Sequence, residues 1–192
     1  MEDALGWRPP AVELAAVRTI IGFTFGNRML ANGNREPGPV NEALADLAQR
    51  LHAATGAPVW AQWEVAEPLA TRLPAGAVTA IHPARDTQAE PRYLNTGGVI
   101  EAIIARAGGA EAIGPVAVVA QRDHAWRCVA LCRQHGLVAG VVEGWPLPGE
   151  YDAASGQPWT RSRLAYLLHD LQCRMLDRRD AVLAGKGPGA LA

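Results

Sequence analysis

Runs of β-branched and other apolar residues alternate along this chain with segments in which apolar residues recur at helical spacing. The runs typical of strands cover residues 17–25, 58–65, 77–82, 115–120 and 137–143. Helical spacing marks residues 40–54, 95–107 and 123–135, and a last helix that begins near residue 160. Strands that alternate with helices pair in parallel through right-handed crossovers. The sequence therefore predicts an α/β fold, a three-layer sandwich of about five mainly parallel strands with helices on both faces.

The size and composition of the chain fit one folded domain. Its 192 residues are 49% hydrophobic and 19% charged, which suits a self-supporting core and is too apolar for a disordered chain. We expect this domain to span residues 1–184. We expect residues 185–192, which are rich in glycine and alanine, to form a flexible tail.

Charge and hydropathy argue against two classes of partner. The net charge is -1 at pH 7, whereas a protein that binds nucleic acid needs clustered excess lysine and arginine. No run of about 18 apolar residues is present, so we expect no membrane-spanning segment. The three cysteines form no Cys-x-x-Cys pair and we expect no secretory leader, which together favour a cytoplasmic location.

Several catalytic chemistries lack the residues that they need. The single lysine, Lys186, lies in the tail, so neither Schiff-base catalysis nor a P-loop has a lysine to use. No Gly-x-Ser-x-Gly motif is present for a serine hydrolase of that type. The sequence identifies no cofactor.

The helix predicted at residues 123–135 invites comparison with a metal site. One of its faces carries His124, Cys128, Cys132 and His135. Positions eight and eleven residues apart lie about 12 and 16 Å apart along a helix axis, too far to ligate one ion. We therefore expect no metal site, and we expect the two cysteines to be small buried apolar side chains.

The segment from Gln121 to Arg127 is the first candidate site, because parallel α/β sheets bind ligands beyond the carboxyl ends of their strands. It joins a strand end to a helix start, where unpaired N–H groups and the helix dipole favour an anion. His124 and Arg127 are three residues apart and project to one side of the first turn. We expect the helix start to lower the pKa of His124, leaving a neutral imidazole as a general base. In the simpler interpretation, Asp123 caps the helix and pairs with Arg127 at the surface.

The loop after the first strand is a second candidate. Gly22, Asn27 and Arg28 are its ligand-binding candidates, although its glycines do not match the Gly-x-Gly-x-x-Gly spacing of a dinucleotide site. In the alternative interpretation the loop is a turn in which Gly26 has a positive φ. Arg28 would face the same pocket as Arg127 if the first strand neighbours the strand at 115–120.

Two further candidates follow other strands. Asn95 or Thr96 caps a helix, and the two glycines that follow would let a ligand approach its N-terminus closely. Glu64 is the acidic residue near the end of the second strand, where it could act as a base or bind a ribose. The alternative for Glu64 is an exposed carboxylate. Residues 67–73 then leave room for a short turn of helix at best.

The order of these features resembles the YdcF-like or SanA-like family, bacterial proteins built on a domain of unknown function with a Rossmann-like α/β fold. The likeness rests on Leu-Asn-Thr-Gly-Gly-Val-Ile-Glu at 94–101 and on Val-Val-Ala-Gln-Arg-Asp-His-Ala-Trp-Arg at 118–127, and it continues into 132–137. The resemblance implies a pocket formed by Gly22, Asn95, Thr96, His124 and Arg127.

The chain also departs from that family. Residues 62–64 read Gln-Trp-Glu where the family has Ser-Gly-Gly, and Asn41 or Glu42 stands where the family has an arginine. Many relatives carry a membrane segment that we do not find here. These differences indicate a divergent member with its own substrate.

Together, these features predict a cytoplasmic enzyme, a hydrolase or a group transferase, that acts on an anionic small molecule of the phosphate or nucleotide type. Arg127, Arg28 and the helix start at Thr96 would hold the ligand, while His124 handles a proton and Glu64 is the second catalytic candidate. The alternative is a non-catalytic binding protein that uses the same pocket. A structural alternative treats Trp126, Trp145 and Trp159 as an exposed homodimer patch.

Overall fold

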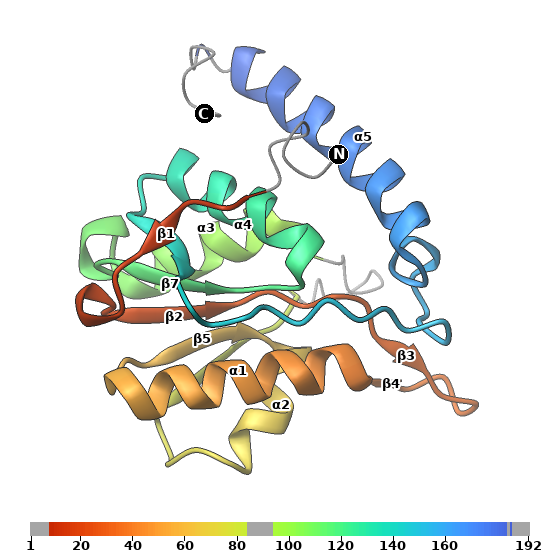
Figure 1. Ribbon diagram of the computed structural model, residues 1–192, viewed down its shortest axis with the longest axis horizontal. Coiled ribbons are helices and arrows are strands. Elements are labelled where there is room, and N and C mark those ends of the chain that lie inside the picture. The colour runs from red at the N-terminus through yellow and green to blue at the C-terminus, as the bar shows by residue number, and fades with distance from the viewer. Residues whose placement is uncertain (1–7, 84–93, 184, 186–192) are drawn as a thin grey trace.

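The computed structural model describes residues 8–83, 94–183 and 185. Its main sheet has six parallel strands in the order β1-β8-β7-β2-β5-β6 (Figure 1). These strands are β1 (Ala11–Val12), β2 (Thr19–Gly22), β5 (Val59–Gln62), β6 (Val78–Ile81), β7 (Val116–Val119) and β8 (Ala139–Val142). The α/β prediction is confirmed, with one more strand than the sequence indicated. β1 has only two residues, which is too short to create a periodic pattern.

Helices cover both faces of the sheet (Figure 1). They are α1 (Pro39–Thr55) and α2 (Trp63–Ala70) on one face, and α3 (Thr96–Ala107) and α4 (Arg122–Gln134) on the other. Ile20 packs into the core beside α1 and α2, and its neighbour Ile21 packs into the core beside α3 and α4. Because successive side chains of a strand point to opposite faces, β2 supplies both cores and sits at the centre of the molecule.

The second strand ends earlier than its apolar run suggested. β5 stops at Gln62, and Trp63 begins α2, so Glu64 lies in the first turn of a helix rather than at a strand end. The prediction of only a short turn at 67–73 was wrong for the same reason. Val65 and Leu69 are four residues apart and are both buried under the sheet. A short apolar run fits both the strand period and the helical period, and residues 63–65 adopt the helical one.

The start of α1 is tied to the loop that follows β2. Gly38 is the N-cap and Pro39 occupies the first helical position, which suits a residue without an N–H group. Asn41 instead turns its amide toward the loop after β2, where it accepts a hydrogen bond from the Phe25 N–H at 2.9 Å. It also donates to the carbonyl oxygen of Gly26 at 2.7 Å. Asn41 therefore fixes the loop that leaves the central strand.

Short elements fill the connections. β3 (Arg28–Met29) and β4 (Arg35–Glu36) pair in an antiparallel hairpin beyond the end of β2. Turns of 3-10 helix occupy Leu14–Ala16, Ala110–Ala112 and Pro158–Thr160. The first two are labelled η2 and η3, and the third, η4, leads into the last helix. None of these was predicted, because two or three residues carry no period.

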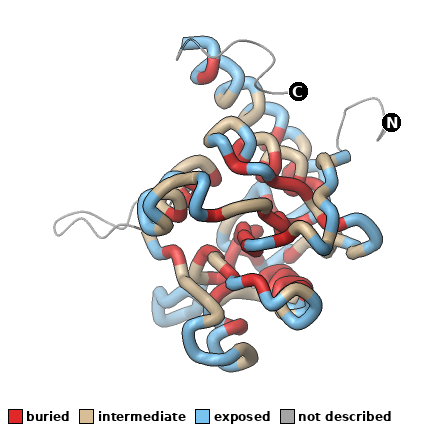
Figure 2. The backbone as a smooth tube through the Cα atoms, turned by 90° about the vertical axis from the view of Figure 1, so that its left-hand side faces the viewer, coloured by how far each residue is buried: buried red, intermediate tan, exposed pale blue. Residues whose placement is uncertain are grey.

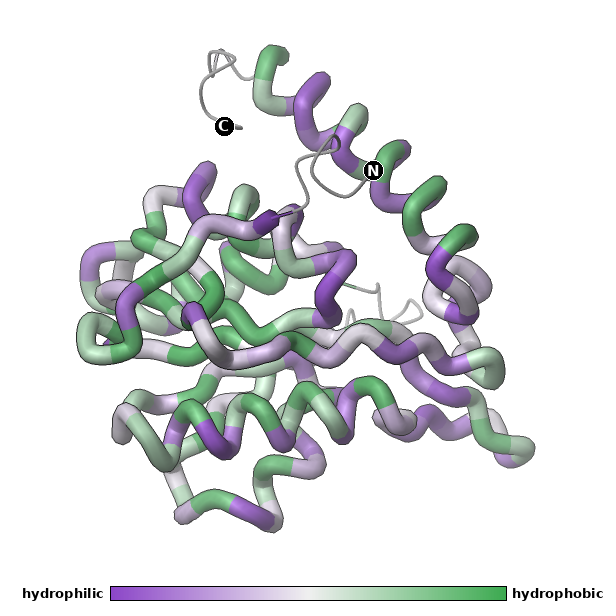
Figure 3. Tube along the Cα trace, in the orientation of Figure 1, coloured by the Kyte–Doolittle hydropathy of each residue, from purple (hydrophilic) through white to green (hydrophobic). Residues whose placement is uncertain are grey.

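The last helix, α5 (Arg163–Leu183), lies outside the three layers and begins beside the carboxyl ends of the strands (Figure 1). Its buried residues are Tyr166, Asp170 and Ala181. Five residues predicted this helix by their spacing, and four of them are exposed instead, namely Leu164, Leu168, Leu171 and Met175, while Leu167 is half-buried. Most residues toward the C-terminal end of α5 are coloured as exposed in Figure 2, and hydrophobic residues recur along the helix in Figure 3.

Most of the predicted tail, residues 186–192, lies outside the described residues. Among the helices that are described, none combines the length and the hydropathy that a membrane crossing requires.

Replacing Gly140 tests whether β1 belongs to the sheet. A Cβ atom there would lie 2.5 Å from the carbonyl carbon of Ala11 and 2.7 Å from the nitrogen of Val12. Both are backbone atoms that cannot rotate away, so Gly140→Ala should displace β1. We expect the free energy of unfolding, measured in urea, to fall by on the order of 2 kcal/mol.

Gly97→Ala is the matched control. A Cβ atom at Gly97 would have its nearest neighbour at 3.6 Å, within a helix. Alanine is favoured over glycine in helices by about 1 kcal/mol, so this variant should lose no stability. Equal losses in the two variants would contradict the close approach of β1 to β8.

Candidate functional site

The candidate site lies where the strand order reverses. From β2, the chain builds the sheet toward β5 and β6, and later toward β7 and β8 on the other side. The ends of β2 and β7 are therefore neighbours with diverging connections, which is where such sheets bind ligands. A cavity of about 230 Å³ opens there, and its strand-end wall is formed by Thr24, Phe25, Gly26 and Gln62. We call it the strand-end cavity.

Four of the nine predicted site residues line this cavity. They are Asn95 and Thr96 at the start of α3, and His124 and Arg127 in the first turns of α4. The other five, Gly22, Asn27, Arg28, Glu64 and Gln121, lie outside its lining. The first four come from two helices that lie side by side on one face of the sheet.

His124 is a buried imidazole in an aromatic setting. Its ring centroid lies 6.2 Å from that of Phe25 and 5.9 Å from that of Tyr166. Its Nδ1 atom has no hydrogen-bond partner among the described residues. Burial holds the pKa of His124 well below its ordinary 6.5, and the positive charge of Arg127 lowers it further. The imidazole is therefore neutral at pH 7, as the sequence predicted, but mainly because it is desolvated.

Arg127 contributes a cation that already has two partners. Its Nε donates to Asp170 Oδ1 at 3.1 Å, and its Nη1 lies 3.8 Å from Asp177 Oδ2. Asp170 is fully buried and also accepts from Arg174 Nε at 2.6 Å. Both acidic residues lie on α5. An anion in the cavity would share the charge of Arg127 with them.

The simpler interpretation of this segment, in which Asp123 caps α4 and pairs with Arg127, is wrong. Asp123 accepts from the Tyr151 hydroxyl at 2.6 Å and from Arg163 Nε at 3.1 Å. The cap is Gln121, whose Oε1 accepts from the Asp123 N–H at 2.7 Å. Because the carboxylate of Asp123 binds a phenol and a guanidinium group, it does not cap the helix.

The start of α4 does not offer the free N–H groups that the sequence predicted for an anion. The Arg122 N–H donates to the carbonyl of Pro148 at 2.8 Å. The next two, of Asp123 and His124, donate to the side chain and the carbonyl of Gln121. Gln121 is fully buried and acts as the helix cap. The N–H groups at this helix start are therefore bound by groups of the chain itself.

The start of α3 differs, because its cap residue also lines the cavity. Asn95 Oδ1 accepts from the Gly98 N–H at 2.8 Å, which identifies Asn95 as the cap. Thr96 follows it and is buried at the cavity wall. The positive end of the α3 dipole therefore faces the cavity. Of the two predicted anion sites at helix starts, the structure favours this one.

The loop after β2 is shaped by the chain around it. Gly26 has φ +75°, as the turn interpretation predicted, and a Cβ atom there would lie 2.5 Å from the hydroxyl oxygens of Ser155 and Thr160. Arg28 pairs with Asp152, with Nε 2.7 Å from Oδ2, and this holds the pKa of Asp152 below its ordinary value. Arg28 thus anchors the segment after β8 instead of lining the cavity.

Gly22 has a packing role in β2. A Cβ atom at Gly22 would lie 3.0 Å from the Cβ of Ala61 on the neighbouring strand and 3.2 Å from Val65. The glycine lets α2 pack closely against the sheet. It is not among the residues that line the cavity.

Glu64 and Asn27 form a buried pair. Glu64 is fully buried, so the exposed alternative is wrong, and its Oε1 accepts from Asn27 Nδ2 at 3.3 Å. Its Oε2 has no partner among the described residues. Burial raises the pKa of Glu64 to about 7, although the bond from Asn27 opposes the shift. The carboxyl group is half protonated near neutral pH.

The wall that α5 supplies to the cavity was not predicted from the sequence. Tyr166, His169 and Cys173 line the cavity, with Cys173 Sγ 3.4 Å from His169 Nε2. Trp159 stacks on His169, with ring centroids 4.8 Å apart. The signal was the polar stripe on this helix, in which residues 166, 169, 170 and 173 recur three and four apart. The helix was predicted instead from the apolar residues on its opposite side.

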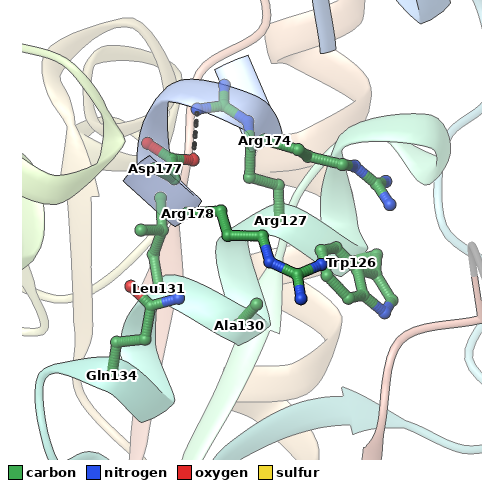
Figure 4. Close-up of a pocket in the computed structure, with 8 residues that line it drawn as sticks. All are labelled: Trp126, Arg127, Ala130, Leu131, Gln134, Arg174, Asp177 and Arg178. Atoms are coloured by element: carbon green, nitrogen blue, oxygen red, sulfur yellow. Dashed lines mark ion pairs between the residues drawn. The ribbon is translucent and has the colours of Figure 1, made fainter. Parts of the chain in front are cut away.

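A second cavity, of about 170 Å³, lies between α4 and α5 (Figure 4). Figure 4 shows Arg127 reaching Asp177 there. The Arg174 guanidinium lies over the Trp126 ring, 4.1 Å from its centroid. The polar groups of this cavity are mainly ion-paired guanidinium and carboxylate groups. Since it holds no imidazole and no hydroxyl group, it is the weaker candidate for chemistry.

The described residues offer no group of three or more histidine, cysteine or acidic side chains that could hold a metal ion. Cys128 and Cys132 are fully buried, as predicted, and burial raises the pKa of both thiols. Each of the three tryptophans of the proposed homodimer patch packs against a side chain of this chain. Trp126 packs under Arg174, Trp145 under Arg50 and Trp159 on His169.

No family model matches the chain, and no curated protein or solved structure matches it either. The resemblance to the YdcF-like family therefore stays a prediction.

Glu64→Gln tests the buried carboxyl group through its pH dependence. The folded pKa of about 7 lies above the ordinary 4.5, so the folded chain binds this proton more tightly than the unfolded chain does. The stabilising effect is present below pH 4.5 and is lost as the pH rises toward 7. Glutamine stays neutral throughout. The free energy of unfolding of the variant, minus that of the wild type, should rise with pH by up to about 3 kcal/mol and level off above pH 7.

Urea unfolding at a series of pH values measures that difference, since all other titrating groups are shared by the two proteins. Leu69→Val, a change between two neutral side chains in the same helix, is the matched control: it removes buried apolar surface but no titrating group, so its difference from the wild type should not depend on pH. A flat difference for Glu64→Gln as well would mean that the carboxyl group is solvated.

Alkylation tests whether the Cys173 thiol at the cavity wall can be reached from solvent. Cys173 is half-buried at the cavity wall, whereas Cys128 and Cys132 are fully buried, so iodoacetamide should modify Cys173 alone in the folded protein. Burial raises the pKa of Cys173, so the reaction should accelerate at alkaline pH. Mass spectrometry of peptides locates the label, and Cys173→Ser should abolish it. Equal labelling of all three cysteines would contradict the packing of α4.

Proposed function

We propose that the protein is an enzyme that acts on a small anionic molecule in the strand-end cavity, with His124 as the group that transfers a proton. The observation that carries this proposal is the state of the imidazole. It lines the cavity, its Nδ1 has no partner among the described residues, and burial keeps it neutral. A neutral imidazole can accept a proton from water or from a substrate hydroxyl group. Hydrolysis and group transfer both use that step, and the proposal covers both.

The anionic group of the ligand would lie at the start of α3. Asn95 and Thr96 line the cavity there, and the first turn of a helix presents N–H groups and a positive dipole end. Arg127 adds a guanidinium group, but Asp170 and Asp177 already share its charge. We therefore infer a ligand with one anionic group, such as a phosphate monoester or a nucleoside monophosphate.

The rest of the ligand would contact aromatic side chains. Phe25, Tyr166 and Trp159 line the cavity, and ring faces of this kind suit a flat or apolar group. The volume of about 230 Å³ is smaller than the roughly 300–1,000 Å³ of a typical ligand pocket. Both features favour a compact substrate over a dinucleotide.

The same site supports the resemblance to the YdcF-like family. Four of the five residues that the resemblance implies, Asn95, Thr96, His124 and Arg127, line one cavity. We infer a divergent member that works in the cytoplasm, where the three free thiols would stay reduced.

One observation favours a non-catalytic binding protein as the second candidate. No carboxylate among the described residues hydrogen-bonds to Nδ1 of His124, whereas a histidine that acts as a base is usually oriented by one. In that case His124 would only donate or accept one hydrogen bond to the ligand.

His124→Ala separates the two candidates. A thermal-shift panel of inorganic phosphate, nucleoside monophosphates and sugar phosphates identifies a ligand of the wild type. A ligand at about 100 times its Kd adds roughly 2.7 kcal/mol and should raise Tm by about 5–10 °C. For an enzyme, His124→Ala should abolish turnover of the identified ligand while its Kd rises less than about tenfold.

His52→Ala is the matched control, because His52 lies in the last turn of α1 and does not line the strand-end cavity. It should leave both turnover and Kd unchanged. Loss of affinity in His124→Ala with no turnover by the wild type would favour the binding protein. A ligand whose Kd is the same in His124→Ala, Thr96→Ala and the wild type would sink both candidates.

A further inference from the structure

The last helix presents its apolar side outward. Seven of the eleven exposed large hydrophobic side chains among the described residues lie on α5. The buried side of the helix is polar in its middle, where Asp170 is fully buried and Arg174 is 16% exposed. Patches of this kind on a folded protein mark sites that another surface covers.

The exposed side chains follow a defined spacing. Leu164, Leu168, Leu171, Met175, Arg178 and Val182 are separated by four, three, four, three and four residues. This is the seam of a left-handed pair of helices, in which apolar residues repeat every 3.5 residues on average. Five of these positions lie on the side of α5 opposite to Tyr166 and Asp170, and Arg178 lies at the edge of that side, where it also lines the cavity between α4 and α5.

We propose that this seam binds the same seam of a second copy of the chain, with the two α5 helices antiparallel around a two-fold axis near residue 173. In that register Leu164 faces the partner's Val182, and Leu171 faces the partner's Met175. Leu168 faces the partner's Arg178, whose methylene groups can cover it while the guanidinium group reaches water. Every seam position then has a partner, as a self-complementary two-fold interface requires.

The charges beside the seam allow this register. The positions that directly follow Leu164, Leu171 and Arg178 form one flank of the seam, and this flank meets the same flank of the partner. There Arg179 comes opposite the partner's Ala165, and Gln172 comes opposite the partner's Gln172 near the axis. Arg174 does not reach the seam, because it is bound to Asp170 and lies over Trp126. The antiparallel arrangement therefore places no like charges opposite each other across the exposed edges.

The size of the seam suits a dimer. Leu164, Leu168, Met175 and Val182 are each between 59% and 73% exposed, over a helix of 21 residues. Two copies that covered these side chains would together bury on the order of 1,000 Å², which is where specific interfaces begin. An interface of this size is at the small end of the range, so we expect a reversible dimer.

Pairing would also hold the wall of the strand-end cavity. Tyr166, His169 and Cys173 line the cavity from the inner side of α5, while the seam occupies its outer side. The argument for the dimer does not use the proposed function, since it rests on the exposure and spacing of the seam.

Leu168→Glu tests the interface by placing a carboxylate in the seam. Light scattering after size exclusion should give twice 20.4 kDa for the wild type at micromolar concentration and 20.4 kDa for the variant. Val138→Glu, which alters an exposed apolar residue away from α5, is the matched control and should remain dimeric. Circular dichroism checks that each variant is folded. A wild type that stays monomeric, or a Leu168→Glu variant that is folded and dimeric, overturns the proposal.

A cysteine at the axis tests the register. In Gln172→Cys the two introduced thiols would meet, so mild oxidation should give a covalent dimer, whereas Asp180→Cys should not. Covalent dimer from Asp180→Cys alone would overturn the antiparallel arrangement. Binding of monomeric wild type to vesicles of anionic phospholipid, lost in Leu168→Glu, would assign the seam to a membrane surface and equally overturn the dimer.

Discussion

The buried carboxylate of Asp170 is the interaction on which the arrangement of the site depends. It accepts hydrogen bonds from Arg127 on α4 and Arg174 on α5, and from the Tyr166 hydroxyl at 3.4 Å. A buried charge needs such partners, because leaving it unpaired costs several kcal/mol. Asp170 and its partners therefore hold the polar side of α5 against α4.

This orientation of α5 has two consequences. On the inner side, it brings Tyr166, His169 and Cys173 over the ends of the strands and closes a cavity that the sheet alone would leave open. On the outer side, it turns the leucine seam toward solvent. The cavity wall and the exposed apolar stripe are thus two sides of the same helix, fixed by the same ionic contacts.

The strand-end cavity combines a neutral imidazole with a guanidinium group whose charge is already balanced. His124 owes its low pKa first to burial among rings, and Arg127 owes its position to the acidic residues of α5. Glu64, fully buried beside Asn27, adds a carboxyl group that titrates near pH 7 close to the strand ends. Glu64 does not line the cavity, so the ionisable groups that face it are those of His124, Arg127 and the inner side of α5.

The sequence by itself determined the parallel α/β sandwich, since each long helix and central strand carries its own period over at least four residues. It also located His124, Arg127, Asn95 and Thr96, because strand ends and helix starts bring these positions to one edge of the sheet. Only the tertiary structure decided which helix start faces the cavity, that Arg28 binds Asp152, and that Glu64 is buried. It alone decided which side of α5 faces inward, because the hydrophobic spacing of α5 carries no information about the ion pair between Asp170 and Arg127, which are 43 positions apart.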